Sequence, residues 1–146
     1  LNLRGLKWAE QLGRRFRSLK LWFVIRAYGV AGLQKIIRDH VAWAEQLAER
    51  LGAVPGIELT SPVQLGLFSF RIRPEGTEDG EALDRLNAEF LDAVNGDGTI
   101  YLTQTVHEGR YIIRVSIGTT ATSQDDIDIA FDTIMRLANP YLKTAI

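Results

Sequence analysis

A block of five apolar residues near the start of the chain constrains its fold more than any other feature. Residues 21–25 (LWFVI) directly follow a cationic stretch, residues 14–20 (RRFRSLK), and together they predict a helix over residues 15–28. From Leu21 onward, apolar side chains lie on nearly every side of this helix, which is typical of a helix that is buried all round. A domain of this size cannot bury such a helix as one of its outer helices, so we expect protein outside this chain to cover it.

Positive charge is concentrated in the same region. Residues 1–26 carry seven Lys and Arg and one Glu, so the other residues carry −7 in a chain whose net charge is −1. Such asymmetry indicates a partner for the basic segment. Stacking on nucleic acid requires aromatic residues between the cations, and a membrane-surface helix requires a basic face opposite an apolar face. Neither pattern is present, so we expect no nucleic-acid and no membrane partner, and we favour a linker that enters a buried helix.

The remaining patterns predict a small α+β domain. A second helix is expected over residues 30–51 after Gly29, with His40 on its surface, and a third helix carries Leu83, Phe90 and Val94 on its apolar face. A last helix begins with a capping box of Ser123 and Asp126 and ends at Pro140. Strands are expected over residues 57–60, 63–73, 99–106 and 110–117. The order α-α-β-β-α-β-β-α predicts a small antiparallel sheet with helices packed on one face, preceded by the long buried helix.

The residues alone identify no catalytic, cofactor or metal site. The sequence has no cysteine, which excludes disulfides, thiolate zinc sites and a cysteine nucleophile. His40 and His107 are far apart in the sequence, so they do not suggest a metal cluster. No glycine-rich stretch has the spacing of a phosphate-binding loop. Asp125 and Asp126 are expected in the first turn of a helix, where they interact favourably with the helix dipole.

Arg114 is the one candidate ligand-binding residue. In residues 110–117 (RYIIRVSI), alternation places Tyr111, Ile113 and Val115 on the core face and Arg114 on the other face. A planar guanidinium in the middle of a strand suits bidentate binding of a carboxylate. It can equally pair with an Asp or Glu of a neighbouring strand or extend into water. The residues alone leave both interpretations open.

Three segments, in this order, resemble a known family. They are residues 12–44 (LGRRFRSLKLWFVIRAYGVAGLQKIIRDHVAWA), 65–72 (LGLFSFRI) and 112–128 (IIRVSIGTTATSQDDID). They are similar to the C-terminal domain of group II pyridoxal-phosphate-dependent decarboxylases, in particular the aromatic-L-amino-acid decarboxylases. The first segment is highly specific, and the likeness extends over essentially the whole chain, from about Gln11 to Leu142.

This resemblance implies that the chain is a fragment of a longer cytoplasmic homodimer with the type I aminotransferase fold. Residues 1–14 are then a linker after a mobile loop, and residues 15–146 form the C-terminal small domain. The missing N-terminal large domain of the same protein supplies the lysine, aspartate and histidine that hold pyridoxal 5'-phosphate. None of the lysines in this chain lies in the family's His-Lys motif, so we expect no bound cofactor and no activity of the fragment alone. These lysines are Lys7, Lys20, Lys35 and Lys143.

The resemblance also suggests a substrate. Arg114 matches an arginine that contacts the substrate carboxylate in related glutamate decarboxylases, and the first segment favours an aromatic amino acid as the small-molecule substrate. Two alternatives stay open. The first is the same family with glutamate or histidine as substrate, or with an aldehyde as product. The second is a non-catalytic α+β binding module.

Overall fold

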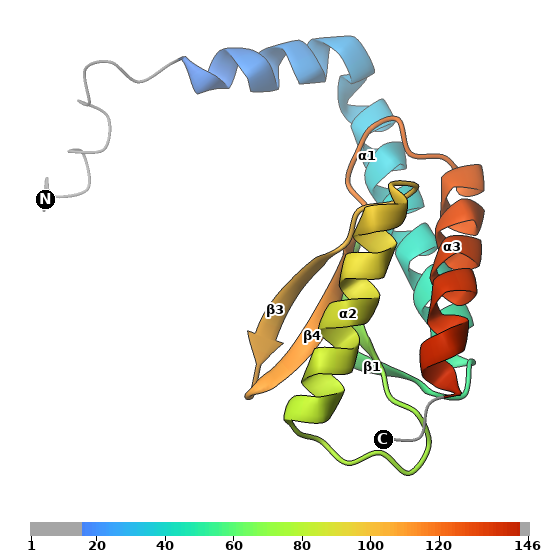
Figure 1. Cartoon of the computed structure of the whole chain (residues 1–146). Helices are drawn as coiled ribbons and strands as arrows, with labels where there is room; N and C mark the ends of the chain where they lie inside the picture. The colour runs from blue at the N-terminus through green and yellow to red at the C-terminus, as the bar shows by residue number, and fades with distance from the viewer. Residues whose placement is uncertain (1–15, 144–146) are drawn as a thin grey trace, which may run out of the picture. The chain divides into compact units, whose positions relative to one another are not determined.

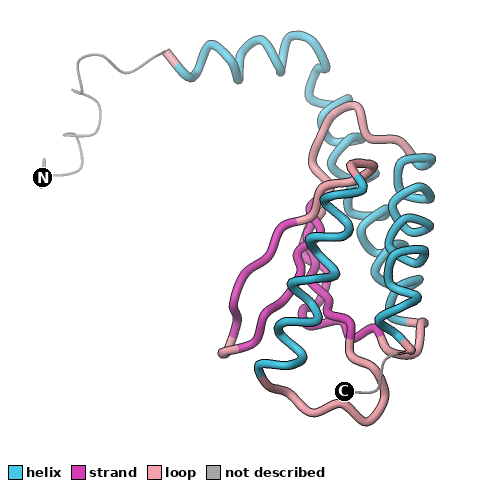
Figure 2. Tube along the Cα trace, in the orientation of Figure 1, coloured by secondary structure: helices cyan, strands magenta, loops and turns pink. Residues whose placement is uncertain are grey.

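The structure, a computed structural model, describes residues 16–143, so the predicted linker of residues 1–14 lies outside the described residues. The chain divides into one unit that ends at Lys35 and a second unit that begins at Ile36. The predicted order of elements is confirmed (Figures 1 and 2), with the first two helices joined into one. The elements are α1 (Arg17–Gly52), β1 (Ile57–Gln64), β2 (Leu67–Ile72), α2 (Glu81–Asp97), β3 (Thr103–His107), β4 (Arg110–Ser116) and α3 (Gln124–Leu142).

Helix α1 contains a kink at Gly29, where the sequence predicted an interruption. Gly29 has φ 66° and ψ 167°, a conformation that side chains with a Cβ atom adopt only with strain. Before the kink, the chain itself leaves large apolar side chains exposed, including Trp22 at 53%. The burial of this helix against protein outside the chain therefore stays a prediction.

The four strands form one antiparallel sheet in the order β1-β2-β4-β3. In the central pair, Phe68 lies opposite Val115 and Phe70 opposite Ile113. These side chains form the core with apolar residues from all three helices, which confirms that the helices pack on one face. The predicted boundary between the first two strands was wrong. Residues 63–64 belong to β1, and the chain turns at Leu65 and Gly66, where Leu65 adopts φ 54°. Position 66 requires glycine, because an added Cβ there would lie 2.3 Å from the Ile117 carbonyl oxygen.

Two further details of the helices differ from the predictions. His40 is buried, not on the surface, and its Nε2 lies 3.0 Å from the carbonyl oxygen of Thr119. It lies four residues from both Ile36 and Ala44, so it shares their inward stripe of α1. Helix α3 continues to Leu142 through Pro140, because a proline so close to the helix end affects only the last turn.

Side chains of α2 complete the sheet where β2 and β4 separate. Their pairing stops at Phe70 and Ile113, so beyond these residues the backbone groups of β2 and β4 that face each other are not paired with one another. The buried amide of Asn87 accepts a hydrogen bond from Ile72 N (2.7 Å) and donates one to Ile72 O (2.9 Å). On the other strand, Asp84 Oδ1 accepts a hydrogen bond from Tyr111 N (3.0 Å). These bonds fix α2 to the end of the sheet.

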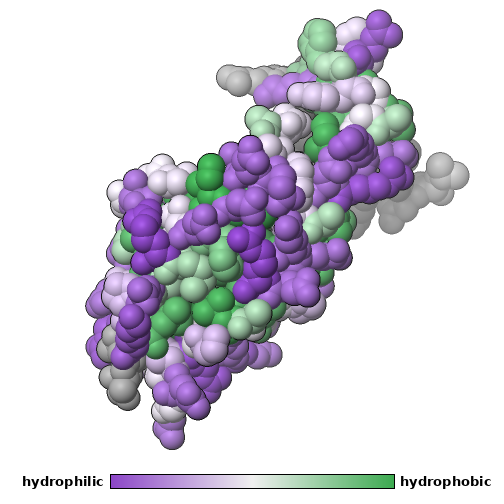
Figure 3. All heavy atoms as spheres, turned by 90° about the vertical axis from the view of Figure 1, so that its right-hand side faces the viewer, coloured by the Kyte–Doolittle hydropathy of each residue, from purple (hydrophilic) through white to green (hydrophobic). Residues whose placement is uncertain are grey.

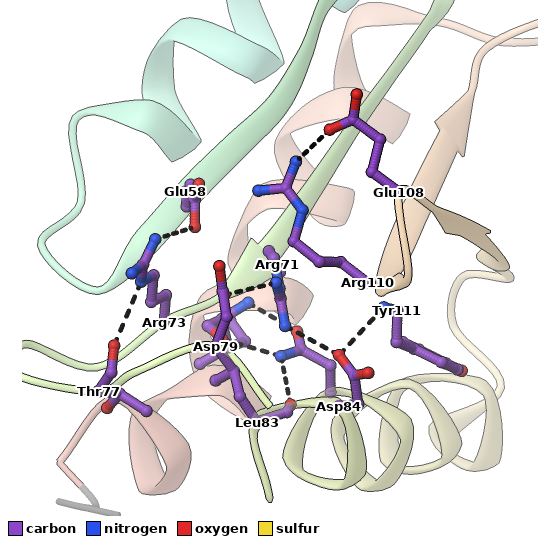
Figure 4. A network of polar contacts seen from close by, with 12 residues as sticks. Glu58, Arg71, Arg73, Thr77, Asp79, Leu83, Asp84, Glu108, Arg110 and Tyr111 are labelled. Carbon is purple, nitrogen blue, oxygen red and sulfur yellow. Dashed lines mark hydrogen bonds and ion pairs between the residues drawn. The ribbon is translucent and has the colours of Figure 1, made fainter. Parts of the chain in front are cut away.

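A buried guanidinium occupies the same gap (Figure 4). The Arg71 side chain is fully buried, and it donates hydrogen bonds to Asp79 Oδ1 (3.0 Å) and Asp84 Oδ1 (2.9 Å). A buried cation is tolerated only when carboxylates and hydrogen bonds compensate for its lost hydration. Arg71 therefore acts as a structural connection between β2 and α2.

We predict that Asp84→Ala destabilises the chain more than Asp79→Ala. Asp84 binds both Arg71 and the Tyr111 backbone, whereas Asp79 binds Arg71 from a more exposed position. Removing one partner of a buried ion pair costs about 3–5 kcal/mol, so Asp84→Ala should lower the free energy of unfolding by about 3 kcal/mol. Urea unfolding measures the free energy of unfolding of both variants. The control is Glu89→Ala at an exposed position of α2, and its free energy of unfolding should lie within about 0.5 kcal/mol of that of the parent chain. An equal cost for Asp84→Ala and Glu89→Ala would contradict this role of the network.

The predicted capping box at the start of α3 is confirmed. Ser123 N donates to Asp126 Oδ2 (2.8 Å), and Asp126 N donates to Ser123 Oγ (3.4 Å). Hydrogen bonds from the backbone and then from the hydroxyl of Ser123 lower the pKa of Asp126 from its ordinary value of 3.8. Because the folded state holds this proton less tightly than the unfolded state, ionised Asp126 stabilises the fold.

We therefore predict that the effect of Asp126→Ala depends on pH. The variant should be less stable than the parent chain above pH 3.8, where the carboxylate is ionised in both states, and the difference should shrink as the pH falls through the lowered pKa. Ser123→Ala should remove only part of the same pH dependence, because alanine keeps the backbone N–H that is the larger cause of the lowered pKa and loses only the hydroxyl. Urea unfolding between about pH 2.5 and pH 6 measures the difference. A difference that is constant over this range would show that the cap does not act through ionisation.

Candidate carboxylate-binding site on the open face of the sheet

The sheet has a polar face opposite the core, which we call the open face. Strand alternation and the register assign its side chains, because residues opposite each other in antiparallel strands share a face. The open face carries Ser61 from β1, Ser69 from β2, Ile112, Arg114 and Ser116 from β4, and Thr103 and Thr105 from β3, whereas the side chain of Arg71 is buried in the gap described above. The predicted direction of Arg114, away from the core, is confirmed.

Arg114 lies in the middle of a row that crosses all four strands. Ser61 pairs with Ser69, Ser69 pairs with Arg114, and Thr103 of β3 pairs with Arg114 from the other side. Neighbouring strands lie about 4.8 Å apart, so each member of the row adjoins the next. Arg114 and Thr103 are exposed, whereas Ser69 is buried.

Arg114 differs from the other arginines around the open face in having no carboxylate partner. Arg71 binds Asp79 and Asp84, as described above. Arg73 binds Glu58 (3.1 Å), and Arg110 binds Glu108 (3.2 Å), as Figure 4 shows. Within residues 16–143, Arg114 forms no such ion pair. An exposed guanidinium without an internal anion is available to bind an anion from outside, and its planar geometry favours a carboxylate.

The hydroxyl groups on one side of Arg114 are already engaged. Thr60 Oγ1 donates to Ser69 Oγ (2.9 Å), and Ser69 Oγ donates to Ser61 Oγ (2.8 Å). Ser61 Oγ also accepts a hydrogen bond from Ser69 N (3.0 Å). The hydroxyl proton of Ser69 is therefore used in a hydrogen bond to Ser61, and the hydroxyl groups on the β2 side of Arg114 bind one another.

The other residues considered in the sequence do not join this site. His107 ends the exposed strand β3, and the carboxylate of Asp126 is bound by Ser123, whereas Asp125 lies beside it in the first turn of α3. A hollow of about 330 Å³ beside the last residues of β4 has a mainly apolar lining, and Asp126 is the one carboxylate among its lining residues. Among the described residues, no group of three or more His, Cys, Asp or Glu side chains could hold a metal ion. The same part of the chain contains no helix with the length and hydropathy of a membrane span.

The described residues do not form a site for pyridoxal phosphate. Lys20 and Lys35 belong to α1 and Lys143 follows α3, so none of these lysines is a residue of the sheet that carries Arg114. Lys7 lies outside the described residues. The open face can therefore bind an anionic group, but the described strands of the sheet provide no lysine for a Schiff base.

Comparisons with known proteins identify relatives of this chain. Residues 5–73 match the Pyridoxal-dependent decarboxylase conserved domain. The chain is 37% identical over 141 residues to tyrosine decarboxylase 4 of Petroselinum crispum, covering 94% of this chain and 28% of that protein. It is 40% identical over 124 residues to tryptophan decarboxylase 2 of Oryza sativa subsp. japonica, covering 85% of this chain and 25% of that protein.

The fold has the same relatives. The chain superimposes on a crystal structure of Oryza sativa TDC with PLP and tryptamine with a TM-score of 0.81 and 32% identity, covering 92% of this chain and 29% of that one. The chain thus spans only about a quarter of the length of the relatives that it matches. The resemblance seen in the sequence is confirmed: this chain is homologous to one part of the group II pyridoxal-phosphate-dependent decarboxylases, whose members related to it include decarboxylases of aromatic amino acids.

Proposed function

We propose that this chain is the C-terminal part of a longer pyridoxal-phosphate-dependent decarboxylase that acts on an aromatic L-amino acid. The observation that carries this proposal is the similarity, over most of the chain, to relatives named for decarboxylation of tyrosine and tryptophan. The fold supports it, since a relative with PLP and tryptamine shares the arrangement of helices and strands. The cofactor itself provides an electron sink for the loss of a carboxylate group, and the missing large domain would hold it.

In this proposal, the chain contributes the open face of the sheet to the active site. Arg114 binds the carboxylate of the substrate, because it is the exposed cation of this face and pairs with no carboxylate of the described residues. A bidentate pair between guanidinium and carboxylate fixes both the position and the plane of the carboxylate. The hydroxyl cluster beside Arg114 links β1 to β2, and β2 is the strand that pairs with β4 next to Arg114.

The exposed part of α1 supports the expected partner, the large domain of the same protein. Before the kink, Phe16, Trp22 and Phe23 are among the exposed apolar side chains, and Trp22 contacts Phe23 edge to face with ring centroids 5.1 Å apart. Contiguous apolar surfaces of this kind mark protein interfaces. We propose that the large domain covers this surface and that the complete protein is a homodimer.

Product analysis of the complete protein that contains this chain tests the proposed function. The protein is supplied with pyridoxal phosphate and then, separately, with L-tyrosine, L-tryptophan, L-glutamate and L-histidine. Release of CO₂ together with an aromatic amine is the expected result. Release of CO₂ from glutamate or histidine alone would identify that amino acid as the substrate. An aryl aldehyde in place of the amine would identify the enzyme as an aldehyde synthase. A protein without any of these products would favour the binding-module alternative.

We predict that Arg114→Ala lowers kcat/KM of the complete enzyme for its amino-acid substrate by about 10- to 100-fold. This range follows from the loss of a hydrogen-bonded pair with a charged group, which is worth about 1.5–3 kcal/mol. The matched control is Arg110→Ala, which removes another arginine of the same strand whose charge pairs with Glu108. Steady-state kinetics should show little change for this control. Equal kinetics for the parent enzyme and Arg114→Ala would exclude Arg114 from carboxylate binding.

A further inference from the structure

We propose that Thr103 is the second donor to the substrate carboxylate and thereby a specificity-determining residue. The inference rests on the proposed function, because it assigns a further residue to the site of Arg114. Its basis is the position of Thr103 on β3, directly opposite Arg114 on β4. Both side chains belong to the open face, and both are exposed.

The register brings the two polar groups within reach of one ligand. Directly opposed residues of an antiparallel pair have Cβ atoms about 4.5–5.5 Å apart. β3 is the edge strand, so no further strand lies beyond Thr103. The long side chain of Arg114 can therefore extend toward β3 and hold an anion beside the threonine hydroxyl.

The other hydroxyl residue beside Arg114 already uses its hydroxyl proton in a hydrogen bond. Ser69, opposite Arg114 on β2, is buried and donates its proton to Ser61 Oγ at 2.8 Å. Thr103 forms no hydrogen bond through its hydroxyl within residues 16–143 that would occupy its proton in this way. Of the two hydroxyls that flank Arg114, the Thr103 hydroxyl is thus the one available to donate to a ligand.

This geometry has a specific chemical consequence. A carboxylate has two oxygens that accept several hydrogen bonds, so it can bind the guanidinium and the hydroxyl together. The amine that remains after loss of CO₂ has no carboxylate and cannot use either donor. Thr103 therefore contributes to binding of the amino acid but not to binding of the amine.

The same strand provides a matched control in Thr105. Thr105 also belongs to the open face, but it lies opposite Ile112, an apolar residue. A valine at either position keeps the size and β-branching of threonine and removes only the hydroxyl. The two substitutions should affect the stability of β3 similarly. They differ in the residue opposite them on β4, which is Arg114 for Thr103 and Ile112 for Thr105.

The test compares Thr103→Val, Thr103→Ser and Thr105→Val in the complete enzyme. We expect Thr103→Val to raise KM for the amino acid about tenfold, the effect of losing one hydrogen bond to a charged group, whereas Thr103→Ser and Thr105→Val stay near the parent value. The second measurement is competitive inhibition by a non-reactive amino-acid analogue and by the matching amine. Thr103→Val should weaken inhibition by the carboxylate-bearing analogue to the same extent and leave inhibition by the amine unchanged.

Two results would overturn the inference. One is a Thr103→Val enzyme whose KM and inhibition constants equal those of Thr105→Val. The other is an equal loss of affinity for the analogue and the amine, which would indicate a general change of the strand. In both cases the parent enzyme still decarboxylates its amino acid, so the proposed function stands. Its own failure is recognised separately, as a parent enzyme without decarboxylation products.

Discussion

The pairing of β2 with β4 is the constraint on which the rest of the structure depends. It places Phe68 and Phe70 opposite Val115 and Ile113, and these four side chains form the central layer of the core. A shift of this register by one residue would bring Ser69 and Arg114 into the core and the aromatic side chains to the surface. The hydrophobic core and the exposed guanidinium are therefore two consequences of one register.

The polar network around α2 stabilises this pairing at the end of the sheet where β2 and β4 separate. Where the ladder stops, Asn87 and Asp84 provide the backbone hydrogen bonds that another strand residue would otherwise make. Arg71 fills the same gap and forms ion pairs with both Asp84 and Asp79. Arg71, Arg73 and Arg110 are each paired with a carboxylate, which leaves Arg114 as the arginine of the described strands that can attract an anionic ligand.

The sequence predicted those features that depend on local spacing. Alternation in β4 placed Arg114 correctly, Gly29 indicated the kink, and Ser123 with Asp126 indicated the start of α3. Features that depend on distant contacts were missed. His40 has the spacing of the buried stripe of α1, but its partner is a carbonyl group 79 residues later in the chain. No local pattern indicates which carboxylates neutralise Arg71, so its burial could not be predicted either.

A crystal structure of the complete protein with a non-reactive analogue of an aromatic L-amino acid would test the central claim most directly. We predict that the open face borders the bound analogue and that the guanidinium of Arg114 lies about 3 Å from its carboxylate oxygens. An analogue whose carboxylate is held entirely by residues of the large domain, with Arg114 turned to solvent, would contradict the account.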